Sequence, residues 1–497
     1  MTNLTNNSKG YFVEPGLLGA RLDASYYTPD AIQAEQRLVT GEQSGNFNVQ
    51  PLEDICSYIM DFQAFSIYNF VEFSETYKDG WIEFLRVQDL NRGFVDTEKV
   101  LWTSPQSHEL MKKSVVQPGD ILLSIIGTLG VATRWTKGHE CNSNQCIAKI
   151  RLKPQYDPGY LVAALNSQTM QILIHRDATG TVQKGLSLGG TRRLRLPLPD
   201  PKIQAYIGDK VRLAEKCREE AEIIKRSAQV LLDEILNLPS IDQLPQMQTN
   251  WWVDPEFAYS DRFDPNYYQP RFLRTEVILG PESSKFSEIV VNAKYGASVP
   301  ADYKEEGIPF IRGTDLLQNR IDLSNLHYLD SSLAPKVKSA KVKAGDVLLT
   351  RSGTVGIAAA INEGLDNFAF GSFMIKLRFK ESISPVYAAA FLNSPYGITQ
   401  IERQKNGAVQ QNINLEEIDR LLLPLLPTDQ QKKISYLWAK WNLFLDYSQR
   451  LINQALSDIE KLIEGEMEIE EILLGKKKSL SWDDIEEEIN GQLINYV

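Results

Sequence analysis

Only a few side chains in this sequence lie close enough together to suggest a chemical site. His139, Cys141 and Cys146 stand together in "GHECNSNQC", and a histidine with two cysteines at this spacing could begin a zinc site. The corresponding stretch of a second, related segment is "EGLDNFAFG", which contains no such ligands. We therefore interpret the two cysteines as free, buried thiols and predict no metal site.

The glycine loops Gly127–Gly130 and Gly353–Gly356 are a second candidate. A nucleotide-binding Walker loop needs glycine, lysine and serine or threonine at the start of a helix, whereas an apolar residue follows each of these loops. Two compatible interpretations remain open. The glycines permit tight turns between strands, or they let the main chain approach a nucleic-acid backbone closely.

A third candidate is "YDPGY" at Tyr156–Tyr160, which is similar to the Asp-Pro-Pro-Tyr loop that holds the target base in amino-methyltransferases. The related segment has "SPVY" at Ser384–Tyr387, with serine in place of aspartate. A helix cap followed by proline explains both stretches, and catalysis explains neither. The four histidines stand in no Ser-His-Asp or Cys-His grouping. We predict no catalytic, cofactor-binding or metal-binding residue in this chain.

The two related segments form a tandem repeat. "GDILLSIIGTLGVA" at Gly119–Ala132 returns as "GDVLLTRSGTVGIA" at Gly345–Ala358, and the same offset in residue number relates Arg86 in "FLRVQDL" to Arg312 in "FIRGTDL". "LNS" follows in each copy at nearly the same offset, and "RLDASYYTP" and "RFDPNYYQP" precede at a slightly larger one. The sequence therefore contains a duplication with both copies complete.

The sequence pattern of each copy predicts the same order of secondary-structure elements, and the last of these elements is a long helix. An apolar strand and the glycine loop precede an alternating strand, a helix capped by Asp157 or Ser384, a polar loop and a proline-rich exit. Apolar residues then recur at steps of three and four over 203–235 and again over 434–462. Three dozen helical residues would span roughly 50 Å at ~1.5 Å each. A narrow seam on so long a helix cannot be covered by its own compact domain, so we expect the two helices to bury their seams against each other.

Composition is that of a globular protein with several domains. The 497 residues are 43% hydrophobic and 24% charged, and no stretch approaches the ~20 apolar residues of a membrane span. The absence of a visible signal peptide and the four scattered cysteines lead us to expect a cytoplasmic protein without a membrane partner. The net charge of −11 argues mildly against nucleic acid, but much of it lies near the C-terminus, and basic and amide side chains cluster in corresponding loops of the two copies.

The doubled order of these motifs resembles the specificity (S) subunit of type I restriction–modification systems. The resemblance rests on "GDILLSIIGTLG" and "GDVLLTRSGTVG", on "TGTVQKGLSL" and "NGAVQQNINL", and on "LPLPDPKIQAYI" and "LPLLPTDQQKKI" before the long helices. It implies an α+β fold, in which two tandem-duplicated mixed α/β target-recognition domains are joined by two long antiparallel coiled-coil helices with pseudo-twofold symmetry. The boundaries we expect are 1–200 for the first domain, 201–238 for its helix, 251–427 for the second domain, 428–474 for its helix, and 476–497 for an acidic tail with a short docking helix.

The resemblance also implies what the chain does. Each domain would recognise one half of a split, non-palindromic target in double-stranded DNA, and the helices would space the domains and dock two methyltransferase (M) subunits. Restriction (R) subunits would complete the complex, and S-adenosylmethionine, ATP and Mg²⁺ would be used by those partner subunits and not by this chain. Three alternatives remain open: an S-like subunit of a related methylation-dependent phage-defence system, a stand-alone methyltransferase or nuclease, and a scaffold whose repeats bind proteins or are degenerate copies.

Two sets of residues follow from this interpretation. Ten are predicted to contact DNA: Arg86, Arg134, Lys184, Arg192 and Arg193 at the first half-site, and Arg312, Arg351, Lys405, Gln410 and Asn412 at the second. Six apolar residues of the long helices are predicted to take part in subunit docking: Ile207, Val211, Leu231, Ile434, Trp441 and Leu451. "SIIGTLG" departs from the second copy in lacking a counterpart of Arg351.

Overall fold

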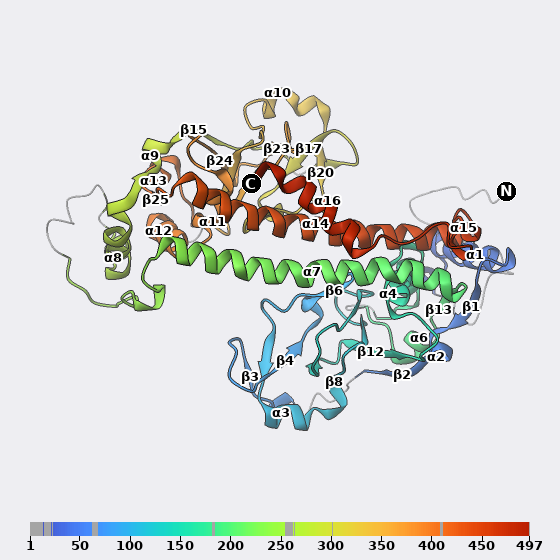
Figure 1. Cartoon of the computed structure of the whole chain (residues 1–497). Coiled ribbons are helices and arrows are strands. Elements are labelled where there is room, and N and C mark those ends of the chain that lie inside the picture. The colour runs from blue at the N-terminus through green and yellow to red at the C-terminus, as the bar shows by residue number, and fades with distance from the viewer. Residues whose placement is uncertain are drawn as a thin grey trace. The chain divides into compact units, whose positions relative to one another are not determined.

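A computed structural model describes residues 13, 21, 23–61, 68–180, 184–253, 262, 264–300, 302–407 and 411–496. The chain divides into two units (Figure 1). The first contains residues 1–219 and 446–486, and the second contains residues 220–445 and 487–497. Each unit therefore combines one copy of the repeat with part of each long helix.

The first copy is built on two β-sheets with the strand orders β10-β9-β12-β2 and β3-β7-β4-β11-β8, in the second of which β11 pairs parallel with β4. A buried cluster that includes Leu85, Leu122, Trp135 and Ile147 forms its core. The strands are β1 (Asn48–Pro51), β2 (Cys56–Met60), β3 (Phe73–Ser74), β4 (Ile82–Leu85), β5 (Leu90–Asn91), β6 (Phe94–Val95), β7 (Leu101–Thr103), β8 (Val115–Val116), β9 (Ile121–Ser124), β10 (Ala132–Arg134), β11 (Cys141–Ser143), β12 (Ile147–Leu152) and β13 (Arg195–Leu198). The helices are α1 (Pro29–Gln43), α2 (Leu52–Ile55), α3 (Pro105–Leu110), α4 (Pro158–Asn166), α5 (Gln168–Asp177) and α6 (Leu188–Arg192).

The second copy has sheets of the order β15-β24-β21-β22 and β16-β20-β17-β23, and here β17 pairs parallel with β23. Ile311, Leu348, Phe370 and Met374 belong to its buried core. The strands are β14 (Ser283–Lys285), β15 (Val290–Tyr295), β16 (Tyr303–Lys304), β17 (Ile308–Ile311), β18 (Leu316–Leu317), β19 (Arg320–Ile321), β20 (His327–Leu329), β21 (Asp346–Thr350), β22 (Ala358–Ala360), β23 (Ala369–Phe370), β24 (Met374–Phe379) and β25 (Leu422–Pro424). The helices are α8 (Pro270–Leu279), α9 (Phe286–Ile289), α10 (Ala334–Val337), α11 (Pro385–Leu392), α12 (Pro395–Gln404) and α13 (Leu415–Ile418).

Corresponding elements of the two copies keep the spacing of the sequence repeat. β10 and β22 begin at the two alanines that end the repeated glycine-loop motif, and α4 and α11, like α5 and α12, begin at the spacing that relates the two "LNS" stretches. The predicted caps are also present, because the side chains of Asp157 and Ser384 accept hydrogen bonds from the backbone of the first helical turn that follows. The predicted duplication and its order of elements are confirmed.

An ion pair between a buried aspartate and a partly exposed arginine explains the Gly-Asp turn before each apolar strand. Gly119 has a φ of +88°, which favours glycine, and the carboxylate of Asp120 accepts hydrogen bonds of 2.8 and 2.9 Å from Arg151 on β12. In the second copy Asp346 accepts a hydrogen bond of 2.7 Å from Arg378 on β24. Both aspartates are at most 1% exposed. The motif therefore ties neighbouring strands together and belongs to the fold.

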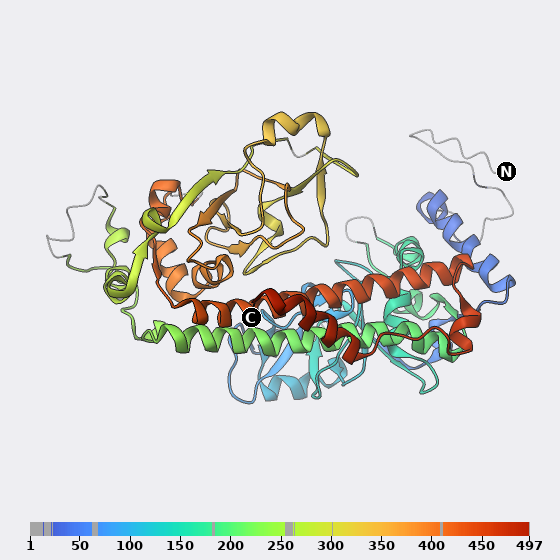
Figure 2. The same ribbon diagram turned by 45° about the horizontal axis from the view of Figure 1, so that its top comes forward.

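The two long helices are α7 (Pro201–Leu236) and α14 (Thr428–Glu464). In the first unit the N-terminal half of α7 lies beside the C-terminal half of α14, where Lys210 and Asp458 form an ion pair (Figures 1 and 2). Because Lys210 lies near the start of α7 and Asp458 near the end of α14, the two helices run antiparallel, which confirms the predicted pairing. α7 ends before Pro239, as predicted, and Asn237 follows it with a φ of +47°.

Two short helices follow α14, namely α15 (Ile469–Leu473) and α16 (Trp482–Gln492). α16 lies in the acidic tail, where a short helix was predicted. No helix among the described residues is long and apolar enough to cross a membrane. The observed α+β fold, with two β-rich repeats and two long helices in contact, confirms the predicted fold class.

Candidate nucleic-acid interface

The glycine loops are tight turns held by the same hydroxyl group in both copies. The side-chain oxygen of Ser124 accepts a hydrogen bond of 2.8 Å from the Val131 amide, and that of Thr350 accepts one of 2.9 Å from the Ile357 amide. All four glycines have φ values between +78° and +102°, in the region that favours glycine. Within each loop the first glycine, Gly127 or Gly353, is exposed. Both interpretations of the loops therefore remain open, because the first glycine is accessible and the loop is a turn.

Each glycine loop is joined to the polar loop that follows the repeat's second helix. Isolated β-bridges pair Ile126 with Gly185 in the first copy and Ser352 with Asn412 in the second. The Leu186 amide donates to the Ile125 carbonyl over 2.8 Å, which holds the first pair of loops together. Two segments that are distant in sequence thus form one surface in each copy. The side chains on this surface differ between the copies, whereas its backbone is the same.

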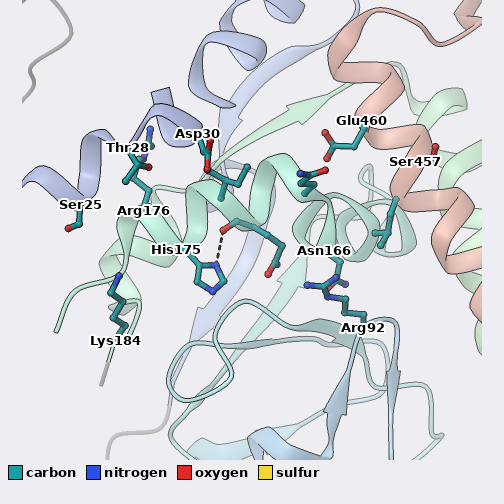
Figure 3. Close-up of a pocket in the computed structure, with 14 residues that line it drawn as sticks. Ser25, Thr28, Asp30, Arg92, Asn166, His175, Arg176, Lys184, Ser457 and Glu460 are labelled. Atoms are coloured by element: carbon teal, nitrogen blue, oxygen red, sulfur yellow. Dashed lines mark hydrogen bonds between the residues drawn. The ribbon is translucent and has the colours of Figure 1, made fainter. Parts of the chain in front are cut away.

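In the first unit this surface borders an open groove with a cavity volume of about 820 Å³ (Figure 3). A second hollow of about 630 Å³ adjoins it along Gly127–Leu129. Four residues line both: Arg92 from the turn between β5 and β6, Gln171 and His175 from α5, and Lys184 from the polar loop. The groove therefore gathers three basic side chains beside the glycine loop.

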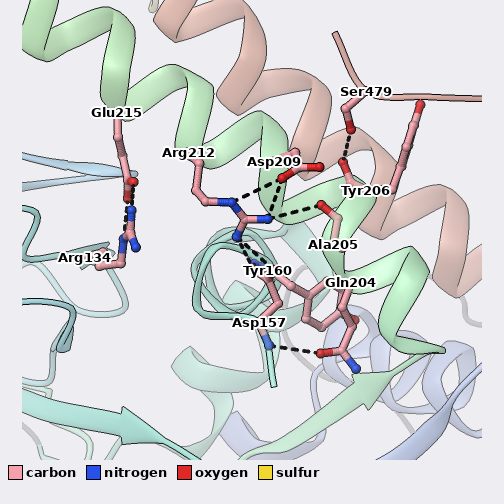
Figure 4. Close-up of polar contacts among 10 residues, drawn as sticks. All are labelled: Arg134, Asp157, Tyr160, Gln204, Ala205, Tyr206, Asp209, Arg212, Glu215 and Ser479. Carbon is pink, nitrogen blue, oxygen red and sulfur yellow. Dashed lines mark hydrogen bonds and ion pairs between the residues drawn. The ribbon is translucent and has the colours of Figure 1, made fainter. Parts of the chain in front are cut away.

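Two of the predicted DNA contacts in the first copy lie in ion pairs. Arg86 pairs with Asp89 at 2.9 Å, and Arg134 pairs with Glu215 of α7 (Figure 4). Lys184 lines the groove, and Arg192 and Arg193 are exposed at the end of α6. The structure therefore places Lys184 on the candidate surface, whereas ion pairs hold the side chains of Arg86 and Arg134 within the fold. DNA contact by these residues stays a prediction.

The residues predicted to contact DNA in the second copy also divide into those held in ion pairs and those on the loop surface. Arg312 forms an ion pair of 2.6 Å with Asp315, and Lys405, 13% exposed, pairs with Glu402. Arg351 stacks on Tyr295, with 4.9 Å between the guanidinium carbon and the ring centroid, and lies 3.4 Å from the Ile413 and Ser372 carbonyl oxygens. Asn412 forms the bridge between the two loops. Gln410 lies outside the described residues.

Most of the residues predicted for subunit docking are buried within this chain. Leu231 is half-buried, and the other five are at most 7% exposed: Ile207, Val211, Ile434, Trp441 and Leu451. The chain itself covers these side chains, so a partner could reach them only if the helices moved apart. Docking by these side chains stays a prediction.

Polar contacts fix the first copy on α7 (Figure 4). Asp157, the cap of α4, accepts a hydrogen bond of 2.9 Å from the Tyr160 amide and two of 2.8 Å from Arg212. Glu215 is 5% exposed, and burial raises the pKa of its carboxyl although Arg134 opposes this. The aspartate of "YDPGY" therefore caps a helix and anchors it, as the comparison of the two copies predicted.

The histidine and cysteines of "GHECNSNQC" do not form a ligand set in the structure. His139 lies 3.0 Å from Glu83, and no group of three His, Cys, Asp or Glu residues able to hold a metal ion occurs in the described part of the chain. Cys141 is buried, as expected, whereas Cys146 is only half-buried, which corrects the expectation that both would be buried. Cys146 lies in the turn immediately before β12, whereas the sequence pattern grouped it with the buried strand that follows.

Sequence reasoning missed Arg92 and His175, the other basic side chains that line both hollows, and the aromatic neighbour of Arg351. Arg92 stands in "NRG", a two-residue turn between short strands, which is a recognisable signal for an exposed loop. His175 occupies the exposed side of a helix whose other side is buried. Tyr295 gave no local signal, because its contact with Arg351 joins two segments that are distant in sequence.

Comparison with known proteins supports the resemblance of the motifs. Residues 284–441 match the family described as "Type I restriction modification DNA specificity domain". The chain is 24% identical over 412 residues to the "Type I restriction enzyme EcoBI specificity subunit" of Escherichia coli, with 78% of each chain covered. Both matches are to specificity (S) subunits of type I restriction–modification systems, so the chain is similar to that family.

Two solved structures of S subunits also align with most of this chain. The S subunit from M. genitalium is 14% identical, with a TM-score of 0.43, and the comparison covers 84% of this chain and 95% of that one. The HsdS subunit from Thermoanaerobacter tengcongensis is 14% identical, with a TM-score of 0.26, and the comparison covers 85% and 97%. The matched family segment lies in the second copy and the start of its long helix, and the repeat relates the first copy to it.

Proposed function

We propose that this chain is a type I specificity (S) subunit that recognises a bipartite, non-palindromic sequence in double-stranded DNA, with one copy of the repeat at each half-site. The observation that carries the proposal is the paired loop surface, which has the same backbone in both copies but different side chains. Arg351 and Asn412 have Ile125 and Gly185 as their counterparts, so equivalent surfaces offer different donors and acceptors. Different half-sites follow from this difference.

Contacts with DNA come from exposed residues of these surfaces. Lys184, Arg192 and Arg193 are exposed in the first copy, and Asn412 and the stacked Arg351 are half-buried on the loop surface of the second. Basic side chains give affinity through phosphate groups, and the amide and guanidinium groups distinguish base edges. Arg86, Arg134 and Arg312 act indirectly in this proposal, since their ion pairs hold the frame that positions the loops.

An exchange of residues 251–427 for those of another S subunit tests the assignment. We expect one half of the methylated sequence to change and the other to stay the same when host DNA is mapped for methylation. The matched control is the reciprocal exchange of residues 1–200, which should change only the other half. A change of both halves by either exchange would contradict one copy per half-site.

The long helices set the spacer and dock methyltransferase subunits in this proposal, and restriction subunits complete the assembly. One of the similar solved structures is titled "Structural basis underlying complex assembly andconformational transition of the type I R-M system", which places that chain in such an assembly. S-adenosylmethionine, ATP and Mg²⁺ belong to those partners. Deleting two residues from 203–235 should change the number of base pairs between the half-sites, or abolish methylation, without changing the half-site letters.

The docking surface proposed here is exposed and apolar. Ile223 and Val230 of α7 are 57% and 55% exposed and, seven residues apart, lie on one side of the helix. We expect Ile223→Glu with Val230→Glu to prevent co-purification of the methyltransferase subunit while the S subunit stays folded. Gln229→Glu, an exposed change on the adjacent side of α7, is the control. Co-purification that survives the double change would place the contact elsewhere.

A further inference from the structure

The positions around the two glycine loops carry different charges in the two copies. The three basic side chains of the first-copy groove are replaced at equivalent positions of the second copy by two amides and a carboxylate: Arg92 by Gln318, His175 by Glu402 and Lys184 by Gln411. Each pair keeps the spacing at which the surrounding helices and strands repeat. The structural context is also the same, because residues 92 and 318 each precede a positive-φ residue, Gly93 or Asn319.

The basic side chains of the first copy are exposed and available. Arg92, His175 and Lys184 are all exposed, and neither Arg92 nor Lys184 forms an ion pair or side-chain hydrogen bond within the described part of the chain. His175 Nδ1 lies 2.8 Å from the Gln171 carbonyl oxygen, so Nδ1 carries the hydrogen and Nε2 is left for another partner (Figure 3). The three side chains converge from different elements on one hollow.

Among the described residues that line the hollow beside the glycine loop, none is acidic. The lining consists of the three basic residues, Gln171, and residues of the glycine loop with the adjoining Val131. The wider groove contains two acidic residues: Glu460, whose carboxylate accepts hydrogen bonds from the Thr169 amide and hydroxyl, and the exposed Asp30, which does not line the hollow beside the glycine loop. Arg176, which also lines the wider groove, is paired with Glu35 at 2.9 Å. An excess of positive charge therefore lies next to the exposed backbone of Gly127.

The equivalent positions of the second copy carry no such excess. Gln318 and Gln411 are neutral, and the carboxylate of Glu402 is paired with Lys405. A further cation of the second loop surface, Arg351, lies against Tyr295 and two carbonyl groups. Because the backbone geometry is shared and the charges differ, the two copies cannot bind an anion equally at this place.

We propose that the first-copy groove binds phosphate groups of the DNA backbone and that its second-copy equivalent does not. Phosphate oxygens accept hydrogen bonds from arginine, lysine and histidine, and an exposed glycine turn lets the backbone approach closely. The proposal rests on the proposed function and specifies it. The groove of the first copy therefore adds phosphate contacts, and salt dependence, that the equivalent place in the second copy does not supply.

The test exchanges the residues between the copies and measures the salt dependence of binding to duplex DNA. Arg92→Gln, His175→Gln and Lys184→Gln, combined in the full-length S subunit with its co-purified subunits, remove the three basic groups. We expect the slope of log K against log salt to become shallower by about 1 for each phosphate group that the variant no longer binds. The half-site letters should not change. Lys113→Gln, which removes an exposed lysine of the same unit outside the groove, is the control.

A second variant makes the opposite change. Gln318→Arg with Gln411→Lys should steepen the slope by about 1 to 2, because it builds the missing contacts in the second copy. Inorganic pyrophosphate added at constant ionic strength shows whether a free phosphate compound occupies the groove instead. Competition that depends on Arg92 and Lys184 without any change in the DNA slope would assign the groove to a small phosphate ligand and overturn the proposal.

The outcomes separate the inference from the proposed function. If the complex binds and methylates its target but the triple variant keeps the slope of the unmodified protein, the groove is not a phosphate site and the inference is wrong. If the unmodified complex shows no sequence-selective binding to DNA, the proposed function itself fails. A shallower slope accompanied by an altered half-site sequence would show that these side chains contact bases, which also overturns the inference.

Discussion

The asparagine of "LNS" should be one of the most important residues for the stability of each unit. Asn166 is 2% exposed, and its side-chain amide donates to the Ala132 carbonyl over 2.7 Å and accepts from the Ala132 amide over 3.1 Å. Asn393 makes the same two contacts with Ala358, at 2.8 and 3.0 Å. Each asparagine thus pairs with the edge of β10 or β22 as a neighbouring strand would.

Replacing Asn166 by alanine leaves two buried backbone groups of Ala132 short of a partner. An unsatisfied buried donor or acceptor costs ~1–3 kcal/mol. The carbonyl retains a contact of 3.2 Å with the Gly93 amide, so the loss falls mainly on the N–H group. We expect Asn166→Ala to destabilise the first unit by about 1–3 kcal/mol, and Asn166→Asp by at least as much, because a carboxylate cannot donate to the carbonyl.

Hydrogen exchange localises this effect better than a melting curve, since a chain of two units need not unfold in one step. Protection of the Ala132 amide and of β9 should fall in Asn166→Ala, while protection of β21 stays unchanged. Asn393→Ala should show the opposite distribution. Asn453→Ala, at an exposed position of α14, is the control. Exchange at Ala132 that stays as slow as in the unmodified protein would refute the proposed role of the asparagine.

Three further predictions follow from buried titratable groups. Burial lowers the pKa of Lys149 from 10.5 to about 8, so the free energy of unfolding should rise as the pH rises from about 8 to 10.5. Lys149→Met should remove this pH dependence and stabilise the first unit at pH 7 by up to about 3 kcal/mol, measured by denaturant unfolding. Burial raises the pKa of Glu215 above 4.5, so the folded state binds its proton more tightly. Stability should therefore fall as the pH rises just above 4.5, and Glu215→Gln should abolish that fall in the same assay. Burial raises the pKa of the Cys56 thiol to about 12, whereas Cys146 is half-buried, so iodoacetamide should modify Cys146 first, as peptide mass mapping would show.

The repeat, the order of elements, the helix caps and the paired long helices could be predicted because each depends on local patterns or on a comparison within the chain. The partners of charged side chains could not be predicted in the same way. Glu215 is far from Arg134 in sequence, and nothing in the neighbourhood of either residue indicates the pair. The pair of Arg86 with Asp89 is local, and its recurrence as Arg312 with Asp315 was visible in the sequence, but basic charge was taken as a sign of DNA contact.

The two copies themselves separate residues of the fold from residues of the interface. A duplicated domain must keep the contacts that hold its backbone, so the ion pair of Asp120, the amide of Asn166 and the pair of Arg86 each recur in the second copy. Recognition of two different sequences requires the opposite, because side chains that contact bases must diverge. Arg92 and Lys184 diverge in charge while their backbone context is kept. By this criterion, residues that contact DNA are expected at exposed positions where the two copies have different residue types. Arginines that both copies share are better interpreted as structural residues that form ion pairs within each domain.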